Sequence, residues 1–276
     1  MKNTLKVLAT AVTLSLSASA YADIVIDDFN TSQLPVLQDN TTLGGGFWST
    51  VAGPTTSILG GVRELYVERT GGTASQGISG LGTTSASVDG GTYSFSSDTQ
   101  TAGIGVLRWD GSATVADGAG TLAGNVRGLG LNGGLGENFT GVSEFLIDVI
   151  FADLGFLFSI GIYSTDGSSS IVTLTSSGGT GLRHIPLIAF LAPSGNYDDP
   201  FNPGADLNVN VVNNGFVFAD LATVGALEAV INPGGGTLAL DLTIDSASAI
   251  PEPASLALVG LGLLGLGATR RRLKTA

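Results

Sequence analysis

Carboxylates are the side chains of this 276-residue chain whose types and spacing most readily support chemistry. The densest group of oxygen ligands lies in the segment 194–208, which contains Asp198 and Asp199. Hard cations such as Ca²⁺ take about six to eight oxygen ligands, so this segment is a candidate calcium site. Its spacing departs from the EF-hand pattern, and no glutamate stands at the closing position. A solvated loop with Asx turns is therefore the alternative interpretation.

Two further carboxylates, Glu64 and Glu68, share one face of an expected strand with Tyr66 between them. A glycosidase needs two carboxylates about 5 to 9 Å apart. Four positions along a strand separate these two by about 13 Å, which is too far. We therefore expect a solvated or saccharide-facing strand whose charges form cross-strand ion pairs with arginines, rather than a catalytic pair.

Aromatic side chains are candidates for sugar binding. Trp48, Tyr66, Trp109 and Tyr197 could stack on sugar rings if they lie on one concave face, but such residues also commonly form the core. The single histidine, His184, lies in an apolar run, and the chain has no Gly-x-Ser-x-Gly nucleophile motif. His184 is therefore expected to be structural, and a histidine-based zinc site lacks its companion ligands.

The elements that must position these residues are short strands. Apolar runs alternate with segments rich in Gly, Ser, Thr, Asn and Asp, a pattern typical of strands joined by turns. We predict eleven strands, at 24–27, 62–69, 92–96, 104–109, 143–151, 155–163, 171–176, 183–191, 207–212, 226–232 and 237–244. The segments 143–151 and 155–163 are expected to pair antiparallel, and Phe145, Ile147, Val149 and Phe151 are expected to share one face.

The sequence therefore predicts an all-β fold, an antiparallel β-sandwich of jelly-roll type, as one domain over residues 23–249. A barrel and a β-solenoid are the alternatives, although no fixed repeat period supports a solenoid. Disorder is excluded by the high apolar content and the clean alternation.

The charge and the cysteine content limit which partners and which chemistry are possible. Residues 23–250 contain no lysine and five arginines against 22 carboxylates, a formal charge of −17. Such a surface repels nucleic acid, whereas divalent cations suit it. The absence of cysteine excludes disulfides, thiol catalysis and cysteine-ligated metals.

The N-terminal 22 residues have the pattern of a secretion signal. Lys2 and Lys6 precede the apolar stretch 7–16, and Ala20-Tyr21-Ala22 is a small-residue cleavage pattern. We expect a signal helix that directs export through the Sec translocon and is removed by signal peptidase. An uncleaved anchor is the alternative, but the apolar stretch is shorter than the roughly 20 residues that span a bilayer.

The C-terminal segment 250–276 has three parts in order. Pro251-Glu252-Pro253 is followed by the uncharged run 254–269 and then by Arg270, Arg271 and Arg272. As a helix, the run would be about 24 Å long, somewhat short of the ~30 Å hydrocarbon core, which flanking arginines can partly offset. We expect a transmembrane helix whose basic end stays cytoplasmic, which leaves the body in the periplasm.

This order of parts resembles the tail of PEP-CTERM proteins of Gram-negative bacteria, the substrates of exosortase. The resemblance implies cleavage near the tripeptide after export, and delivery to the cell surface or the exopolysaccharide matrix. A plain C-terminal membrane anchor is the alternative, although an anchor has no need of Pro-Glu-Pro at its periplasmic edge.

The segments 23–29 and 238–245 resemble the first and last strands of carbohydrate-binding jelly rolls. The resemblance implies that the two strands lie side by side, with a structural calcium held by Asp28 together with Asp241 or Asp245. Aspartates that merely form turns are the alternative.

Together these features lead us to expect an exported, non-catalytic surface or matrix protein that associates with extracellular polysaccharide, with calcium as an optional structural ion. A polysaccharide hydrolase or lyase and a self-assembling adhesin are the alternatives. The enzyme would need two carboxylates, or a tyrosine with arginine or histidine, brought together from distant strands.

Overall fold

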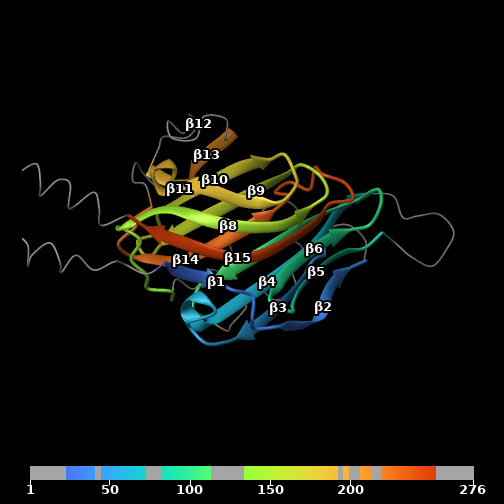
Figure 1. The fold of residues 1–276 in the computed structure, drawn as a ribbon, viewed down its shortest axis with the longest axis horizontal. Coiled ribbons are helices and arrows are strands. Elements are labelled where there is room, and N and C mark those ends of the chain that lie inside the picture. Colours follow the sequence, from blue (N-terminus) through green and yellow to red (C-terminus); the bar gives the residue numbers. More distant parts are fainter. Residues whose placement is uncertain are drawn as a thin grey trace, which may run out of the picture.

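The computed structural model describes residues 23–40, 45–72, 82–112, 134–191, 195–198, 206–212 and 219–252, with 195–198 and 206–212 described as backbone. These residues form two antiparallel sheets that pack face to face (Figure 1). The sheet that we call sheet A contains β1 (Ile24–Asp27), β2 (Gln33–Asp39), β5 (Thr84–Asp89), β6 (Thr92–Ser97), β8 (Val142–Ala152), β11 (Gly181–Pro186) and β15 (Asp241–Pro251).

Sheet B contains β3 (Phe47–Ala52), β4 (Val62–Gly72), β7 (Thr101–Trp109), β9 (Phe156–Ser164), β10 (Ser169–Ser176), β12 (Gly195–Asp198), β13 (Asp206–Val212) and β14 (Val224–Ile231). Two short 3₁₀ helices, η1 (Leu59–Gly61) and η2 (Leu187–Leu191), complete the described elements. No helix among the described residues is long and apolar enough to cross a membrane. The expected signal helix (1–22) and transmembrane run (254–269) lie outside the described residues.

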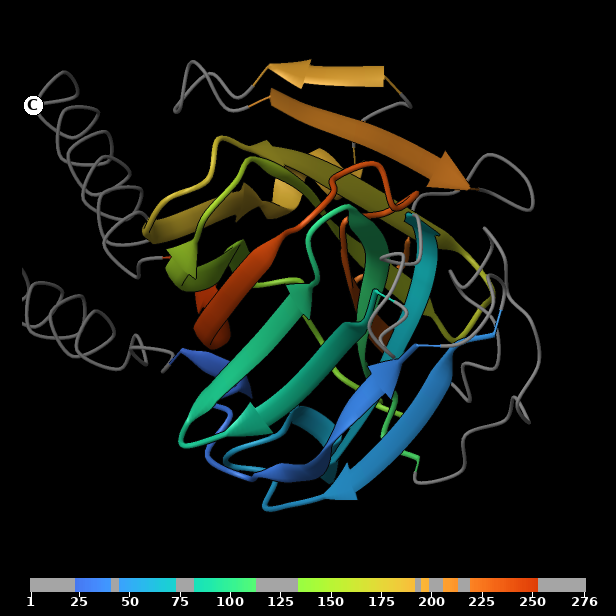
Figure 2. The same cartoon turned by 90° about the vertical axis from the view of Figure 1, so that its right-hand side faces the viewer.

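The strand order confirms the predicted all-β, two-sheet antiparallel sandwich. Sheet A runs β11-β8-β15-β6-β5-β2 with β1 also beside β15, and sheet B runs β12-β13-β10-β9-β14-β7-β4-β3. The chain crosses repeatedly between the sheets, as in jelly-roll sandwiches. The first and last strands do lie side by side, with Ile24 opposite Ala249. At the open side, the edge strands β2 and β3 approach each other (Figure 2), and Gln33 Nε2 donates to Ser49 Oγ at 2.9 Å.

The predicted pairing of 143–151 with 155–163 is wrong. β8 pairs with β11 and β15 in sheet A, whereas β9 lies between β10 and β14 in sheet B. The connection at Asp153 and Leu154 therefore carries the chain from one sheet to the other. Each strand has an apolar face that must be covered, and facing sheets let Phe145 and Phe158 enter one common core.

The face predicted for Phe151 is also wrong, because a β-bulge interrupts β8. Val149 lies opposite Ile244 and Phe151 lies opposite Thr243, so β8 has one more residue than β15 over this step. Such an extra residue moves the following side chains to the other face. Phe151 is accordingly 49% exposed, while Val149 is in the core.

Several strand limits differ from the prediction. The segment 183–191 divides into β11, which ends at Pro186, and the 3₁₀ helix η2. β15 begins at Asp241, after Ala239 with a φ of 54°, and ends at Pro251, beyond the expected domain boundary at residue 249. Four strands were not predicted: β2, β3, β5 and β12.

Candidate functional site

One group of polar and aromatic side chains gathers on the face of sheet B that points away from sheet A. On β4, Leu65 and Val67 pack in the inter-sheet core, so the alternate residues of the strand point to the opposite face. Five strands (β3, β4, β7, β9 and β14) contribute to this group. We call it the outer-face cluster; its members are Trp48, Glu64, Tyr66, Glu68, Arg108, Tyr163 and Glu228.

Arg108 is the centre of the cluster. It lies opposite Glu64 of β4 on one side and opposite Glu228 of β14 on the other. Arg108 Nε donates to Glu228 Oε2 at 2.7 Å, and both side chains are 1% exposed. The hydroxyl of Tyr163 donates to Glu228 Oε1 at 3.2 Å. The ring of Trp48 stacks over the guanidinium, 4.4 Å from centroid to Cζ, which adds a cation–π contact.

A second polar contact lies beside this centre on β4. The hydroxyl of Tyr66 donates to Glu68 Oε2 at 2.8 Å, and the Tyr66 ring packs on Trp48 with centroids 4.7 Å apart. Burial raises the pKa of Glu68; the Tyr66 hydroxyl opposes this rise, and the charge of Asp39 adds to it. Burial also raises the pKa of Tyr66.

The cluster corrects the prediction that β4 is solvated or saccharide-facing. Glu64, Tyr66 and Glu68 are each 1% exposed. A cross-strand ion pair is present beside β4, where Arg108 Nε lies 2.7 Å from Glu228 Oε2. A sugar ring has no access to carboxylates buried to this degree. The arrangement suits rigid support of the sheet better than acid–base chemistry on a glycan.

The sequence contains one signal for this cluster, an isolated charge in each of two apolar strands. Glu228 stands alone among apolar residues in β14, and Arg108 stands alone among apolar residues in β7. A single charge within a buried strand needs a partner of opposite charge. An isolated arginine in one buried strand and an isolated glutamate in another therefore predict that the two strands are neighbours and that the two charges pair.

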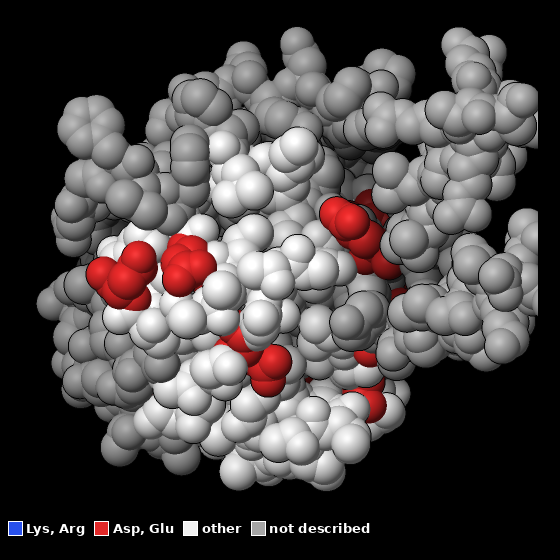
Figure 3. All heavy atoms as spheres, turned by 90° about the vertical axis from the view of Figure 1, so that its left-hand side faces the viewer, with Lys and Arg blue, Asp and Glu red and all other residues white. Residues whose placement is uncertain are grey.

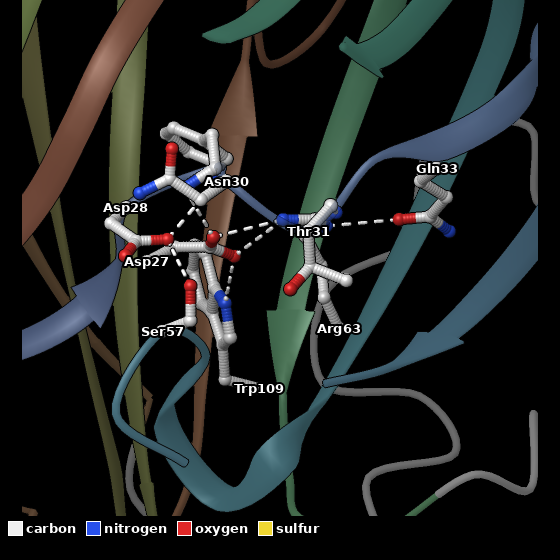
Figure 4. Close-up of polar contacts among 9 residues, drawn as sticks. Asp27, Asp28, Asn30, Thr31, Gln33, Ser57, Arg63 and Trp109 are labelled. Atoms are coloured by element: carbon white, nitrogen blue, oxygen red, sulfur yellow. Dashed lines mark hydrogen bonds and ion pairs between the residues drawn. The ribbon is translucent and has the colours of Figure 1, made fainter. Parts of the chain in front are cut away.

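The second polar network lies inside the sandwich and accounts for Trp109. Asp27 accepts bonds from Arg63 Nη1 at 2.8 and 3.0 Å and from Trp109 Nε1 at 2.9 Å (Figure 4). Arg63 also donates to Gln33 Oε1 at 2.9 Å and to Thr31 O. Trp109 is 2% exposed, so its predicted saccharide-facing role is wrong.

Of the other aromatic candidates, Tyr66 is buried beneath Trp48, which corrects its predicted sugar-facing role as well. Trp48 keeps part of its surface exposed and lies on the edge strand β3. The backbone of Tyr197 belongs to β12, and its side chain lies outside the described residues.

The calcium candidates are separated by the strand register. Asp27 lies opposite Ala247, which is about 20 Å from Asp241 along β15, and the next residue, Asp28, is still about 17 Å away by the same spacing. Asp28 Oδ1 instead accepts from Asn30 N at 2.9 Å and from Ser57 Oγ, as Figure 4 shows. A shared site for Asp28 and Asp241 is therefore excluded, whereas Asp28 with the exposed Asp245 stays a prediction.

No three histidine, aspartate or glutamate side chains of the described residues gather into a set that could hold a metal ion. Asp241 Oδ1 accepts from Ser96 Oγ at 2.5 Å, and Asp241 N donates to Asp153 Oδ1 at 2.9 Å, as in a strand-end turn. The side chain of Asp198 and the whole of Asp199 lie outside the described residues. Calcium binding by the segment 194–208 stays a prediction.

His184 lies on the solvent-facing side of sheet A. Its Nδ1 is 3.0 Å from Glu144 Oε2, and the two side chains are 43% and 30% exposed. This pair joins β11 to β8 at the surface, and a structural role for His184 stays a prediction.

The surface charge of the described body is almost purely acidic. Arg63, Arg69 and Arg108 are buried, and the partly buried Arg183 donates to three backbone carbonyls, those of Gly178, Gly179 and Gly181. On the face drawn in Figure 3, the visible charged side chains of the described residues are aspartates and glutamates. The outer surface therefore offers carboxylates and uncharged groups to a partner.

Two of the predicted sorting residues, Pro251 and Glu252, lie at the end of the sandwich. Pro251 is the last residue of β15, and Glu252 N donates to Gly141 O at 2.9 Å. Pro253, Arg270, Arg271 and Arg272 lie outside the described residues.

Fold and site thus define an acidic, all-β sandwich with two buried ion-pair networks. Residues 249–272 match the PEP-CTERM protein-sorting motif, which confirms the sequence resemblance at this end of the chain. No curated protein matches the chain.

Among solved structures, the chain is similar to a family 11 carbohydrate-binding module of the cellulosomal cellulase Lic26A-Cel5E of Clostridium thermocellum. That match has 13% identity and a TM-score of 0.36, and it covers 85% of this chain and 97% of that one. The Clostridium thermocellum module in complex with a β-1,3-1,4-mixed-linked tetrasaccharide matches with 11% identity and a TM-score of 0.37, over 85% of this chain and 99% of that one. At this level of similarity, no residue role transfers to this chain.

Proposed function

We propose that this chain is an exported, non-catalytic surface or matrix protein that associates with extracellular polysaccharide after its sorting tail is removed. The observation that carries the proposal is the sorting motif at 249–272, which begins within the last strand of a folded acidic sandwich. Export through the Sec translocon, removal of the leader by signal peptidase and cleavage of the tail by exosortase belong to the same proposal. The product would reach the cell surface or the exopolysaccharide matrix.

The buried charges support a binding role over an enzymatic one. Asp27 and Arg108 are each the centre of a group that brings carboxylates together with arginine, and both ion pairs are almost fully buried. A hydrolase or lyase needs such groups within reach of a sugar. These networks are instead suited to stiffening the sandwich.

The surface charge limits how a polysaccharide could be held. A body of formal charge −17 repels an acidic glycan, so contact would run through uncharged sugar faces or through bridging cations such as Ca²⁺. Trp48 is the described aromatic candidate that retains exposed surface, and it lies on an edge strand where a long chain could pass. The cation–π contact of this ring with the Arg108 guanidinium fixes the orientation of the ring before any ligand binds.

A pull-down with the bacterium's own extracellular polysaccharide tests the proposal. The protein would be purified as residues 23–252, with and without calcium, and bound fractions compared. We expect binding that weakens several-fold in Trp48→Ala and persists in the matched control Phe47→Ala, whose ring is 41% exposed on the same strand. Circular dichroism would confirm that both variants are folded.

Failure of the unaltered protein to bind in either condition would overturn the polysaccharide role and leave only export and sorting. Release of new reducing ends from the same polysaccharide would instead establish the enzymatic alternative. Growth of light scattering on addition of calcium, without polysaccharide, would favour the self-assembling adhesin.

A further inference from the structure

The first residues of the sorting motif are part of the folded sandwich. The motif begins at residue 249, while β15 continues to Pro251. In the ladder with β8, Ile250 lies opposite Glu144 and Pro251 lies opposite Val142. The motif and the domain therefore share strand residues, and no linker separates them.

Hydrogen bonds hold this shared segment to β8. Ser143 Oγ donates to Ile250 O at 2.9 Å, and Glu252 N donates to Gly141 O at 2.9 Å. The second bond extends the pairing past the end of the strand. Glu252, the last described residue, is therefore still hydrogen-bonded to Gly141, which directly precedes β8.

The support for β15 changes at Ala249. This residue is fully buried and lies between Ile24 of β1 and Phe145 of β8. Beyond it, the described residues of β1 make no further pairs with β15, so Ile250 to Glu252 are paired on one side, to β8. A strand end held on one side opens more easily than a strand interior.

A protease must bind the backbone around the bond that it cleaves, and a backbone engaged in a sheet is not available for this. Cleavage of a folded substrate then follows the population of the locally opened form. In the sequence, Pro253 alone separates Glu252 from the uncharged run at 254, so the sorting protease has little free chain to use.

We propose that the sandwich regulates removal of its own tail: residues 250–252 must separate from β8, with Ala249 as the hinge, before a membrane-bound sorting protease can bind Pro251 and Glu252. This rests on the sorting step of the proposed function. The pairing of β15 with β8 then sets the rate at which the folded protein leaves the membrane. A body that folds tightly at this end is released slowly.

Engineered disulfides test the proposal, because the chain has no cysteine of its own. Glu144→Cys with Ile250→Cys would lock the strand end, since directly opposite residues have Cα atoms about 4.5 to 5.5 Å apart, within disulfide range. Leu146→Cys with Ser248→Cys, which are also directly opposite, is the matched control, because this pair lies on the interior side of Ala249. Each full-length variant would be expressed in the native bacterium, and loss of the tail followed by pulse labelling and intact mass.

We expect the end-locked precursor to lose its tail about tenfold more slowly or worse, and the interior-locked control to match the unaltered protein. A third variant, with a six-residue Gly-Ser insertion between Ile250 and Pro251, detaches the motif from the sheet and should be cleaved faster than the unaltered protein. It does not depend on the folding of a cysteine variant.

Cleavage of the end-locked protein at the unaltered rate, with the disulfide confirmed by mass, would overturn the proposal. So would an insertion variant that is cleaved no faster. Complete absence of cleavage in the unaltered protein would overturn the sorting step together with this inference. The polysaccharide pull-down uses protein without a tail, so its failure would leave this inference untouched.

Discussion

Asp27 and Arg63 form an ion pair inside the sandwich, although their strands, β1 and β4, belong to different sheets. Arg63 Nη1 is 2.8 Å from Asp27 Oδ1, and both side chains have no exposed surface. The remaining acceptor capacity of Asp27 is used by Trp109 Nε1 and by Phe29 N, each at 2.9 Å. Because the pair is surrounded by matched donors and acceptors, it fixes how sheet A sits on sheet B.

Breaking this pair from one side should be costly. In Arg63→Met, the Asp27 carboxylate stays buried without its cation, and we expect a loss of about 3 to 5 kcal/mol in the free energy of unfolding. Urea denaturation of residues 23–252 measures this. In the double variant Asp27→Asn with Arg63→Met, neither charge remains, and Asn can still accept from Trp109.

The double variant should therefore lose less than the sum of the two single variants, by about 2 kcal/mol. Additive losses would show that Asp27 and Arg63 contribute independently, contrary to the geometry.

Tyr93 presents the opposite situation, a buried polar atom without a bond. Its side chain has no exposed surface, and within the described part of the chain its hydroxyl has no hydrogen-bond partner. Tyr93→Phe removes an unsatisfied group without changing the ring, so we expect a gain of about 1 kcal/mol in stability. Tyr66→Phe is the matched control, because the Tyr66 hydroxyl donates to Glu68, and it should lose about 1 to 3 kcal/mol. Equal effects of the two changes on the urea midpoint would contradict this account.

Gly105 on β7 leaves the space that Tyr93 and Phe95 occupy. A Cβ at this position would lie 2.6 Å from Tyr93 Oη and 2.8 Å from Phe95 Cδ2. Gly105→Ala should therefore destabilise the sandwich by about 1 to 3 kcal/mol through overpacking. Combining it with Tyr93→Phe removes the nearer contact and should recover part of the loss. Thermal melts of the unaltered protein, the two single variants and the double variant check this. An unchanged midpoint in Gly105→Ala would show that the core rearranges to accept the added methyl group.

The sequence predicted which segments form strands better than which strands are neighbours. Alternation in β8 and β9 shows that each has a face to bury, but it contains no information on the partner. Two strands joined by a short connection can form a hairpin or cross to the facing sheet, and only packing decides. The bulge that exposes Phe151 could not be predicted for the same reason, since a bulge depends on how β8 pairs with β15.

The missed strands lie where the apolar pattern is weak. β2 is an edge strand with Pro35 in it, and Leu34 and Val36 are 57% and 44% exposed, so its composition resembles a loop. Proline is tolerated there because the outer side of an edge strand needs no ladder bond. β5 alternates small residues, with Ala86 and Val88 buried, and gives little hydrophobic signal.

The aromatic candidates show a second limit of prediction from sequence, which is whether a given ring is buried or exposed. Trp109 and Tyr66 were candidates for a sugar-facing role, with a core position as the alternative, and both are buried. An aromatic ring with one polar atom suits a core as well as a surface when a partner is present. Asp27 supplies that partner for Trp109 from a strand 82 positions away in sequence. No local pattern reports a contact of that kind. The buried Arg108–Glu228 pair, by contrast, was accessible from the isolated charges in two apolar strands.

Glu68 should make the stability of the sandwich fall as the pH rises. Burial raises its pKa in the folded protein above the ordinary value of 4.5, so between these two values the folded state binds more protons than the unfolded state. Its contribution to stability is therefore fully present below pH 4.5 and is lost as the pH rises through the folded pKa.

Glu68→Gln removes this titration but keeps an oxygen that can accept from Tyr66. The free energy of unfolding of the unaltered protein minus that of the variant should decrease between pH 4 and pH 8, measured by urea denaturation at each pH. The difference isolates Glu68 from the other titrating groups. In a Tyr66→Phe background the decrease should be larger, because the Tyr66 hydroxyl bonds to the charged carboxylate and opposes the rise in pKa. A difference that is constant or increases with pH would show that burial does not dominate the environment of Glu68.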